Sequence, residues 1–557
     1  MHAPKTYRNP ILPGMNPDPS ITYVPPGSSA TPGYYLCTST FEFFPGLPIY
    51  HSLDMVHWTL IGHALNRRSQ GVDMRTVEAS GGLWAPTLRY NVKRGRWYVA
   101  CTCFYKIGDK PYMVEPTGFY VSTDDIHDDS KWSDAVYFEE LGFDQDILFD
   151  DDDRTYLTCT RFHMTYEPEF SMKIVSYSNE FDLSTGRSLS PPRLTMDSVL
   201  GTAEGCHIIK REGWYYLFTA EGGTQDGHQE WVYRSDKPLG PWVAPPVHIN
   251  PIVFNGNHPH IQNTGHLDMV EGENGQWWAV FLGVRPQFKA DQLVNPILMR
   301  SALGRESFMA PVEWVDGWPV VNGQRPIELV GEANVGSVSY VPATNWIDEF
   351  KTTTLQLGWY TIRTPLRPFH SLTSRPGYLS IRGSAYSIDY QESPSALLRK
   401  QPDFEGEWST EMNFLPNVEG TAAGLVVWLD KDAHITLSVR GTRKASGGRG
   451  GSGRELVFKA PSADRSFQET TFQLDSEAGP LVLGVKARKD AYELWYKRAD
   501  EQEAAPTVVG SVKTSLFQPL FTGVHIGVYA QGVAGSPCLE PAYFRYAKWE
   551  VATGIEA

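Results

Sequence analysis

The protein has 557 residues, with 64 acidic side chains against 49 Lys and Arg, and a formal net charge of −15. This acidic balance argues against a nucleic-acid partner, because binding to a phosphate backbone needs a basic surface. At this length one hydrophobic core no longer grows with the chain, so at least two domains are expected. The sequence contains no apolar run of 18 residues, and a membrane partner is therefore not expected either.

Aromatic doublets recur along the first 300 residues at nearly even spacing. Their second members are separated by 63, 58, 60 and 62 residues. The four doublets and one Thr-Tyr variant are Tyr34-Tyr35, Trp97-Tyr98, Thr155-Tyr156, Tyr215-Tyr216 and Trp277-Trp278. The runs around them are β-branched and aromatic, broken by Gly, Pro and Asp turns. A repeat of about 60 residues with this composition is typical of propeller blades. The sequence therefore predicts a five-bladed β-propeller over residues 1–330.

Three polar residues share one position in this repeat. Asp144, Glu204 and His266 each lie twelve residues before the second member of their doublet. Asp18 opens the first repeat, seventeen residues before Tyr35, and a turn-rich insertion accounts for the difference. If this position lies on the innermost strand of each blade, these side chains point toward the propeller axis. The repeat thus predicts an acidic axial pocket with an aromatic floor.

The pattern changes after residue 330 to short alternating strands. Examples are residues 377–382, 424–429 and 481–487. About 200 residues of such strands predict a β-sandwich, which we place over residues 345–557. The expected fold class is therefore all-β, a propeller followed by a sandwich.

The acidic residues of the repeat suit hydrolysis of a glycosidic bond. That reaction needs one protonated carboxylic acid for the leaving oxygen and one carboxylate that activates water or attacks carbon. Glu204 and Asp18 can fill these roles, and Asp144 can raise the pKa of the acid by like-charge repulsion. Asp146, two residues further on, is a rival for the last role. Each residue also has an ordinary structural explanation, as a turn or hairpin carboxylate or, for His266, a core histidine. Their shared position favours function.

Ordered segments across about 280 residues resemble glycoside hydrolase family 43. The C-terminal part is similar to the jelly-roll, concanavalin-like β-sandwich of its β-xylosidase-like and arabinofuranosidase branches. The segments that carry the resemblance are residues 9–21 with Asn16-Pro17-Asp18-Pro19, residues 38–46, Trp84-Ala85-Pro86, Phe143-Asp144, Glu204-Gly205, Thr264-Gly265-His266 and residues 282–286.

The resemblance implies an inverting mechanism, with Asp18 as general base, Glu204 as general acid and Asp144 orienting and tuning Glu204. It also implies that His266 lies under the pocket, where it holds water or a cation. Two further positions match pocket-wall aromatics and one matches a substrate-contacting arginine; they are Phe43, Trp84 and Arg285. Cys206 stands where many relatives have Pro, and Gln145-Asp146 where Pro-Ser is usual.

The resemblance also narrows the substrate. The chain looks most like fungal arabinoxylan arabinofuranohydrolases that remove O3-linked arabinose from doubly substituted xylose. The alternative is a β-xylosidase that releases xylose from xylo-oligosaccharides, and a more remote one is a non-catalytic sugar-binding propeller. Tyr166, in the segment after the third doublet, is a candidate rim aromatic for the xylan chain, although a turn residue packed on its own blade is an equal interpretation.

The remaining expectations concern partners and location. The partner is a polysaccharide such as arabinoxylan, and the protein is expected to act as a monomer. No cofactor is required for turnover, although a structural Ca²⁺ on the axis, reached by His266 through water, is open. Residues 1–9 lack the apolar core of a signal peptide. The chain is therefore either cytoplasmic or a mature secreted form, and we expect the secreted form.

Overall fold

The computed structural model describes residues 6–105, 115–165, 171–293, 295, 297–332, 345–443, 453–474, 479–501 and 503–552. The chain divides into two compact units that interleave along the sequence. The first consists of Met1–Met74, Ser80–Pro286 and Arg305–Val341. The second consists of Arg75–Ala79, Gln287–Gly304 and Pro342–Ala557.

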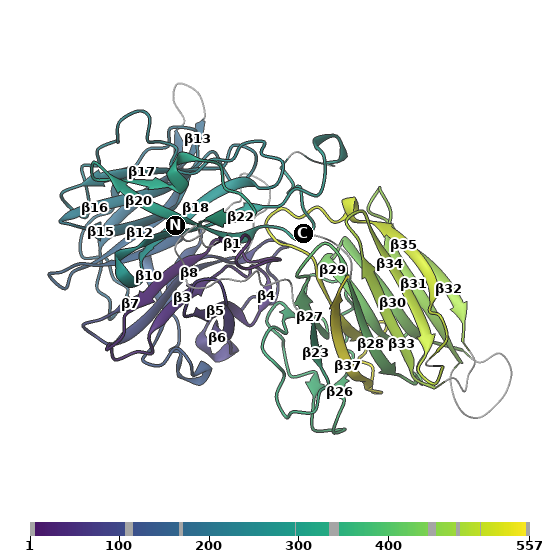
Figure 1. The fold of residues 1–557 in the computed structure, drawn as a ribbon. Helices are drawn as coiled ribbons and strands as arrows, with labels where there is room; N and C mark the ends of the chain where they lie inside the picture. Colours follow the sequence, from purple (N-terminus) through teal and green to yellow (C-terminus); the bar gives the residue numbers. More distant parts are fainter. Residues whose placement is uncertain are drawn as a thin grey trace. The chain divides into compact units, whose positions relative to one another are not determined.

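The first unit contains five separate antiparallel sheets, built from successive strands of the chain and coloured purple to teal in Figure 1. The first sheet contains β2 (Ser20–Val24), β3 (Gly33–Cys37), β5 (Gly46–Ser52) and β6 (Thr59–Leu65), and the second contains β7 (Gly82–Asn91), β8 (Arg96–Phe104), β9 (Thr117–Thr123) and β10 (Val136–Leu141). The third contains β11 (Phe143–Phe149), β12 (Thr155–Thr165), β13 (Ser171–Glu180) and β14 (Arg193–Met196), and the fourth contains β15 (Ala203–Arg211), β16 (Trp214–Glu221) and β17 (Gln229–Ser235). The fifth contains β18 (Gln262–Glu271), β19 (Trp277–Val284), β20 (Glu306–Val315) and β21 (Trp318–Val321).

Every aromatic doublet lies in the second strand of one sheet, namely β3, β8, β12, β16 or β19. Successive residues of a strand point to opposite faces, so each of the four aromatic doublets supplies one ring to each face of its sheet, and Thr155-Tyr156 supplies a ring to one face. Tyr98 packs with Ile147 of the next sheet, and Tyr216 packs with Phe281 of the last. Tyr34 packs with Trp278, which joins the first sheet to the fifth. The doublets therefore build the apolar layers between neighbouring sheets.

The first strands of the five sheets contact one another in a closed order. β2 contacts β7, β7 contacts β11, β11 contacts β15, β15 contacts β18, and β18 contacts β2. The ends of the unit are also joined, because β1 (Thr6–Arg8) pairs with β22 (Val330–Glu332). The first strands therefore surround a common centre.

The second unit is a β-sandwich of two antiparallel sheets, drawn in green to yellow in Figure 1. They share one apolar core that includes Trp408, Leu425, Leu483, Phe544 and Trp549. One sheet contains β23 (Trp346–Asp348), β25 (His370–Ser371), β26 (Leu379–Ile381), β28 (Gly406–Asn413), β33 (Leu481–Ala487), β34 (Ala491–Arg498), β35 (Thr507–Lys513) and β37 (Ala542–Val551). The other contains β27 (Ala396–Lys400), β29 (Ala422–Asp430), β30 (Ala433–Thr442), β31 (Gly453–Pro461), β32 (Phe467–Gln473) and β36 (His525–Gln531).

Helical structure in the described residues is confined to short 3-10 turns. These are η1 (Arg68–Gln70), η2 (Asp129–Lys131), η3 (Glu273–Gly275), η4 (Ala290–Gln292), η5 (Asn322–Gln324) and η6 (Thr514–Leu516); two further short strands are β4 (Phe43–Phe44) and β24 (Thr361–Ile362). The expected all-β class is thus confirmed. Over the same residues, no helix has the length and apolar character needed to cross a bilayer.

Candidate active site

A β-bulge interrupts four of the five first strands at the same place. The pairing with the second strand shifts between Trp84 and Thr87 in β7, and at corresponding points in β11, β15 and β18. One residue in each bulge has a left-handed backbone; these are Ala85 (φ 31°), Asp144 (52°), Gly205 (61°) and His266 (55°). A bulge bends its strand and re-aims the neighbouring side chains. Asp144 and His266 therefore occupy equivalent places, as the sequence repeat predicts, whereas Glu204 lies one residue before the equivalent place, which Gly205 fills.

Asp18 lies just before β2 and is held from two sides. Its backbone is also left-handed (φ 55°), and its side chain is 4% exposed. Arg305 donates from Nη1 to Oδ1 at 2.9 Å and from Nη2 to Oδ2 at 3.4 Å, and the Ser39 hydroxyl donates to Oδ2 at 2.6 Å. These charge-assisted bonds fix the orientation of the carboxylate.

Asp144 of β11 and Glu204 of β15 are carboxyl groups whose charges interact. Asp144 is 6% exposed and accepts the backbone N–H of Gly205 at 3.0 Å, which ties β11 to the bulge of β15. Burial, followed by the charges of Glu204 and Asp18, raises the pKa of Asp144 well above its usual range. Burial also raises the pKa of Glu204 to about 7, against the opposing charge of Arg305 and with a smaller contribution from Asp18. A half-buried carboxyl with such a pKa is suited to donate a proton near neutral pH.

Asp146 belongs to a different cluster from Glu204. It accepts Nη2 of Arg89 at 2.8 Å, and the backbone N–H of Ile208 at 2.9 Å. Asp268 accepts Nη1 of the same arginine at 2.7 Å. Although burial opposes it, Arg89 lowers the pKa of Asp268 to about 2. The structure therefore gives Asp146 an ion pair of its own.

This cluster takes one residue from each of the five first strands. Ser20 of β2 donates to Asp268 at 2.8 Å, and Nδ1 of His207 in β15 lies 3.3 Å from Asp146. Together with Arg89 of β7, these side chains cross-link β2, β7, β11, β15 and β18 at their common centre. We call Ser20, Arg89, Asp146, His207 and Asp268 the central network.

His266 lies beside the base candidate. Its Nδ1 is 3.5 Å from Oδ1 of Asp18, and the residue is 7% exposed. Burial lowers the pKa of His266 to about 3, against the opposing charge of Asp18. The imidazole is therefore neutral. One of its ring nitrogens donates a hydrogen bond and the other accepts one.

The described residues do not offer a calcium cage at the centre. No group of three or more His, Cys, Asp or Glu among them is placed to hold a metal ion. The carboxylates of Asp146 and Asp268 are already paired with Arg89, and His266 provides nitrogen, whereas Ca²⁺ takes six to eight oxygen ligands. We derive no catalytic step through a metal.

The predicted substrate contacts fall in different surroundings. Trp84 is half-buried and stacks on Phe104 with ring centroids 4.4 Å apart. Phe43 is 1% exposed and therefore presents almost no surface, so its predicted contact depends on the resemblance alone. Arg285 donates from Nε and Nη2 to the buried Glu306 at 2.7 and 2.8 Å. Tyr166 lies outside the described residues. These four contacts stay predictions.

Sequence reasoning missed Arg305. It directly precedes β20, in Leu303-Gly304-Arg305-Glu306, and its side chain is 5% exposed. It also donates to the Thr224 hydroxyl at 3.2 Å. The sequence repeat points to the first strands, whereas Arg305 directly precedes β20, the third strand of the fifth sheet. A charged Arg-Glu pair ahead of an apolar strand was the one available signal.

Comparisons with known proteins identify the family of the chain. Residues 7–319 match the family profile described as "Glycosyl hydrolases family 43", and residues 347–550 match the "Beta xylosidase C-terminal Concanavalin A-like domain". The chain is 36% identical over 555 residues to the "Non-reducing end alpha-L-arabinofuranosidase BoGH43B" of Bacteroides ovatus, which covers 97% of this chain and 94% of that protein. It is 33% identical over 442 residues to a "Xylan 1,3-beta-xylosidase" of a Vibrio species, covering 78% and 79%.

A solved structure extends the likeness to three dimensions. The protein titled "Bacteroides ovatus Xyloglucan PUL GH43B" superposes with a TM-score of 0.82 at 35% identity, covering 98% of this chain and 100% of that one. Both units thus have counterparts in this solved structure. The chain belongs to glycoside hydrolase family 43 and is an enzyme that cleaves glycosidic bonds.

Proposed function

We propose that the enzyme is an exo-acting, inverting α-L-arabinofuranosidase. Asp18 is the general base that takes a proton from water as the water oxygen attacks the anomeric carbon. Glu204 is the general acid that gives its proton to the leaving glycosidic oxygen, and Asp144, whose charge interacts with that of Glu204, orients it. The observation that carries the proposal is that one site contains two such groups. The carboxyl of Glu204 has a pKa raised to about 7, and the carboxyl of Asp18 is held by Arg305.

The five sheets are, on this proposal, the blades of a five-bladed β-propeller that forms the catalytic domain over residues 1–330. The support is the closed order of contacts among the first strands and the central network that joins all five. The sandwich domain then occupies residues 345–557. A propeller of this kind exposes its central residues at one face, where a side-chain sugar can enter.

The substrate we propose is the α-L-arabinofuranosyl side chain of arabinoxylan, O3-linked on doubly substituted xylose. The name of the Bacteroides ovatus relative supports arabinofuranose over xylose. A β-xylosidase is the second candidate, supported by the name of the Vibrio relative. Membership in a hydrolase family argues against the sugar-binding propeller without catalysis.

Further parts of the proposal follow from the same assignment. Trp84, Phe43, Arg285, His266 and Tyr166 contact the substrate or its bound water. The enzyme requires no cofactor, acts as a monomer and is secreted. Its partner is the polysaccharide alone.

The test is sugar release from arabinoxylan by the wild type and by Asp18→Ala, with arabinose resolved from xylose and singly from doubly substituted units. We expect arabinose alone, lost from doubly substituted units, and no release by the variant. Proton NMR of the first-formed anomer then tests inversion. Release of xylose from xylo-oligosaccharides would move the assignment to β-xylosidase, and activity left in Asp18→Ala would remove that residue as base.

A further inference from the structure

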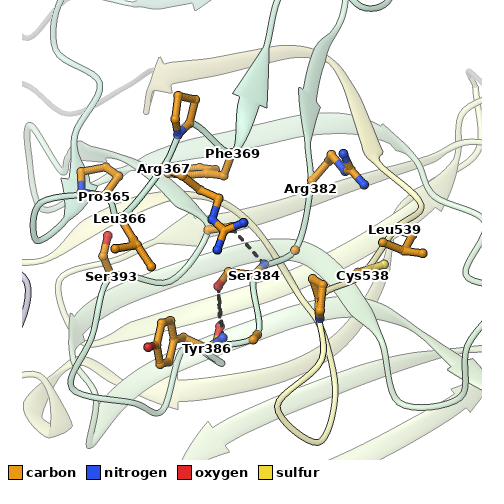
Figure 2. A pocket seen from close by; sticks show the side chains of 15 residues that line it. Pro365, Leu366, Arg367, Phe369, Arg382, Ser384, Tyr386, Ser393, Cys538 and Leu539 are labelled. Carbon is orange, nitrogen blue, oxygen red and sulfur yellow. Dashed lines mark hydrogen bonds between the residues drawn. The ribbon is translucent and has the colours of Figure 1, made fainter.

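The sandwich unit has a cavity of about 410 Å³ of its own (Figure 2). The segments that flank β25 and β26 form two of its walls, and they are joined by the Arg382 N–H, which donates to the Phe369 carbonyl at 2.9 Å. The Cys538 N–H donates to the Gly383 carbonyl at 2.9 Å, and the Ser384 N–H donates to the Ser395 hydroxyl at 3.0 Å. Hydrogen bonds among four separate segments of the chain therefore fix the walls.

Much of the lining is apolar and open to solvent. Leu366 is 40% exposed and Leu539 is 63% exposed, and the rings of Phe369 and Tyr386 are both half-buried in the lining. Apolar and aromatic surfaces of this kind complement the C–H face of a sugar ring. The cavity of about 410 Å³ is of the size of sites that take small organic molecules, and larger than a single small anion needs.

Two arginines are the charged side chains that line the cavity. Arg367 and Arg382 are exposed, and neither guanidinium has an ion pair or a hydrogen bond within the described part of the chain. No Asp or Glu lines the cavity. Figure 2 shows Arg367 amid the lining side chains and Arg382 toward their edge. In a protein of net charge −15, a cavity with two unpaired guanidinium groups selects an anion.

A buried hydroxyl adds a second polar group. Ser393 lines the cavity and is 8% exposed, and its Oγ has no hydrogen-bond partner in the residues that the structure describes. A buried hydroxyl without a partner costs folding free energy, and ligand hydroxyls are suited to satisfy it.

We propose that this cavity binds a hexuronate, an acidic sugar residue of a polysaccharide. The planar guanidinium groups pair with its carboxylate, the aromatic and proline walls cover the ring, and Ser393 meets a ring hydroxyl. The site would hold the enzyme on acidic regions of its polymer. Binding of the acidic sugar in this cavity does not depend on which sugar the catalytic residues release.

Titration calorimetry of the full chain tests this with two matched probes, methyl α-D-glucuronoside and its neutral isostere methyl α-D-glucoside. Acetate and phosphate serve as anions without a sugar ring. We expect the glucuronoside to bind at least tenfold more tightly than the other three. Equal binding of the glucoside would overturn the charge argument, and equal binding of acetate or phosphate would overturn the sugar argument.

The double variant Arg367→Gln/Arg382→Gln locates the site. Both side chains are exposed and unpaired, so we expect an unchanged Tm, at least a tenfold loss of glucuronoside affinity and unchanged turnover of an aryl arabinofuranoside. Arg545→Gln, an exposed arginine of β37 paired with Glu411 and outside the cavity lining, is the matched control and should bind as the wild type. Glucuronoside binding retained by the double variant would refute the proposal, whatever the turnover assay shows.

Discussion

Arg305 donates hydrogen bonds to both carboxylate oxygens of Asp18, at 2.9 Å and 3.4 Å, although the two residues lie 287 positions apart in the chain. The same guanidinium opposes the rise in the pKa of Glu204. One arginine therefore orients the proposed base and also opposes the rise in the pKa of the proposed acid.

Replacing Arg305 by Lys keeps the charge but removes the two-point contact. We expect kcat/KM to fall by about tenfold or more, because a misplaced base loses much of the benefit of orientation. The measurement is steady-state kinetics on an aryl arabinofuranoside. In an Asp18→Ala background the same change should add little, since the two residues act as a unit. Fully additive losses would show that Arg305 acts independently of Asp18.

The pH profile should report the proposed acid. Because Glu204 must be protonated and its pKa is raised to about 7, kcat/KM should fall tenfold per pH unit above about pH 7. An aryl substrate with a very acidic leaving group needs no proton, so its alkaline limb should flatten. An equally steep limb for both substrates would assign the titration to another group.

The same pKa has a consequence for stability. The pKa of Glu204 in the folded state lies above its unfolded value of 4.5. The contribution of Glu204 to the stability of the folded state is therefore fully present below pH 4.5 and is lost as the pH rises through 7. Glu204→Gln removes this loss. We expect the variant to be inactive but to melt a few degrees higher than the wild type at pH 8, and to differ little at pH 4.5. Differential scanning calorimetry at both values checks this, and a lower Tm of the variant at pH 8 would contradict it.

The sequence predicted those parts of the site that the repeat marks. The doublets fall on second strands, and Asp144, Glu204 and His266 fall on bulged first strands, because repeated hydrophobic spacing and repeated backbone geometry leave a periodic signal. The alternating segment at residues 424–429 likewise lies in β29 of the sandwich.

The central network left no such signal. Asp146, His207 and Asp268 each follow the bulge of their strand, but in β7 that place is Thr87 and the arginine of the network lies two residues later, at Arg89. The members of the network are of different residue types, so no single type recurs along the sequence. The role of Arg305 could not be predicted for another reason. Its partner Asp18 lies at the opposite end of the first unit's sequence. The interleaving of residues 75–79 and 287–304 with the second unit also depends on long-range contacts that local patterns do not encode.

Gly205 should resist substitution because of His266. A Cβ at Gly205, where φ is 61°, would lie 2.8 Å from the His266 ring, so Gly205→Ala adds a clash to the strained backbone. We expect lower activity and a lower Tm. Gly213→Ala is the matched control, since φ there is 81° and nothing lies within 4 Å of the added Cβ. Equal effects of the two substitutions would reduce the role of Gly205 to backbone conformation alone.

Arg89 should be the most sensitive residue of the central network. Arg89→Met leaves Asp146 and Asp268, each 0% exposed, without their shared counter-charge. Removing one partner of a buried ion pair costs about 3–5 kcal/mol, so we expect a large fall in the free energy of unfolding, measured by urea denaturation. The triple variant Arg89→Met/Asp146→Asn/Asp268→Asn removes all three charges and should recover part of that loss, because no buried carboxylate is then left unpaired. If the triple variant is no more stable than Arg89→Met, packing and not charge pairing is what the arginine contributes at the centre.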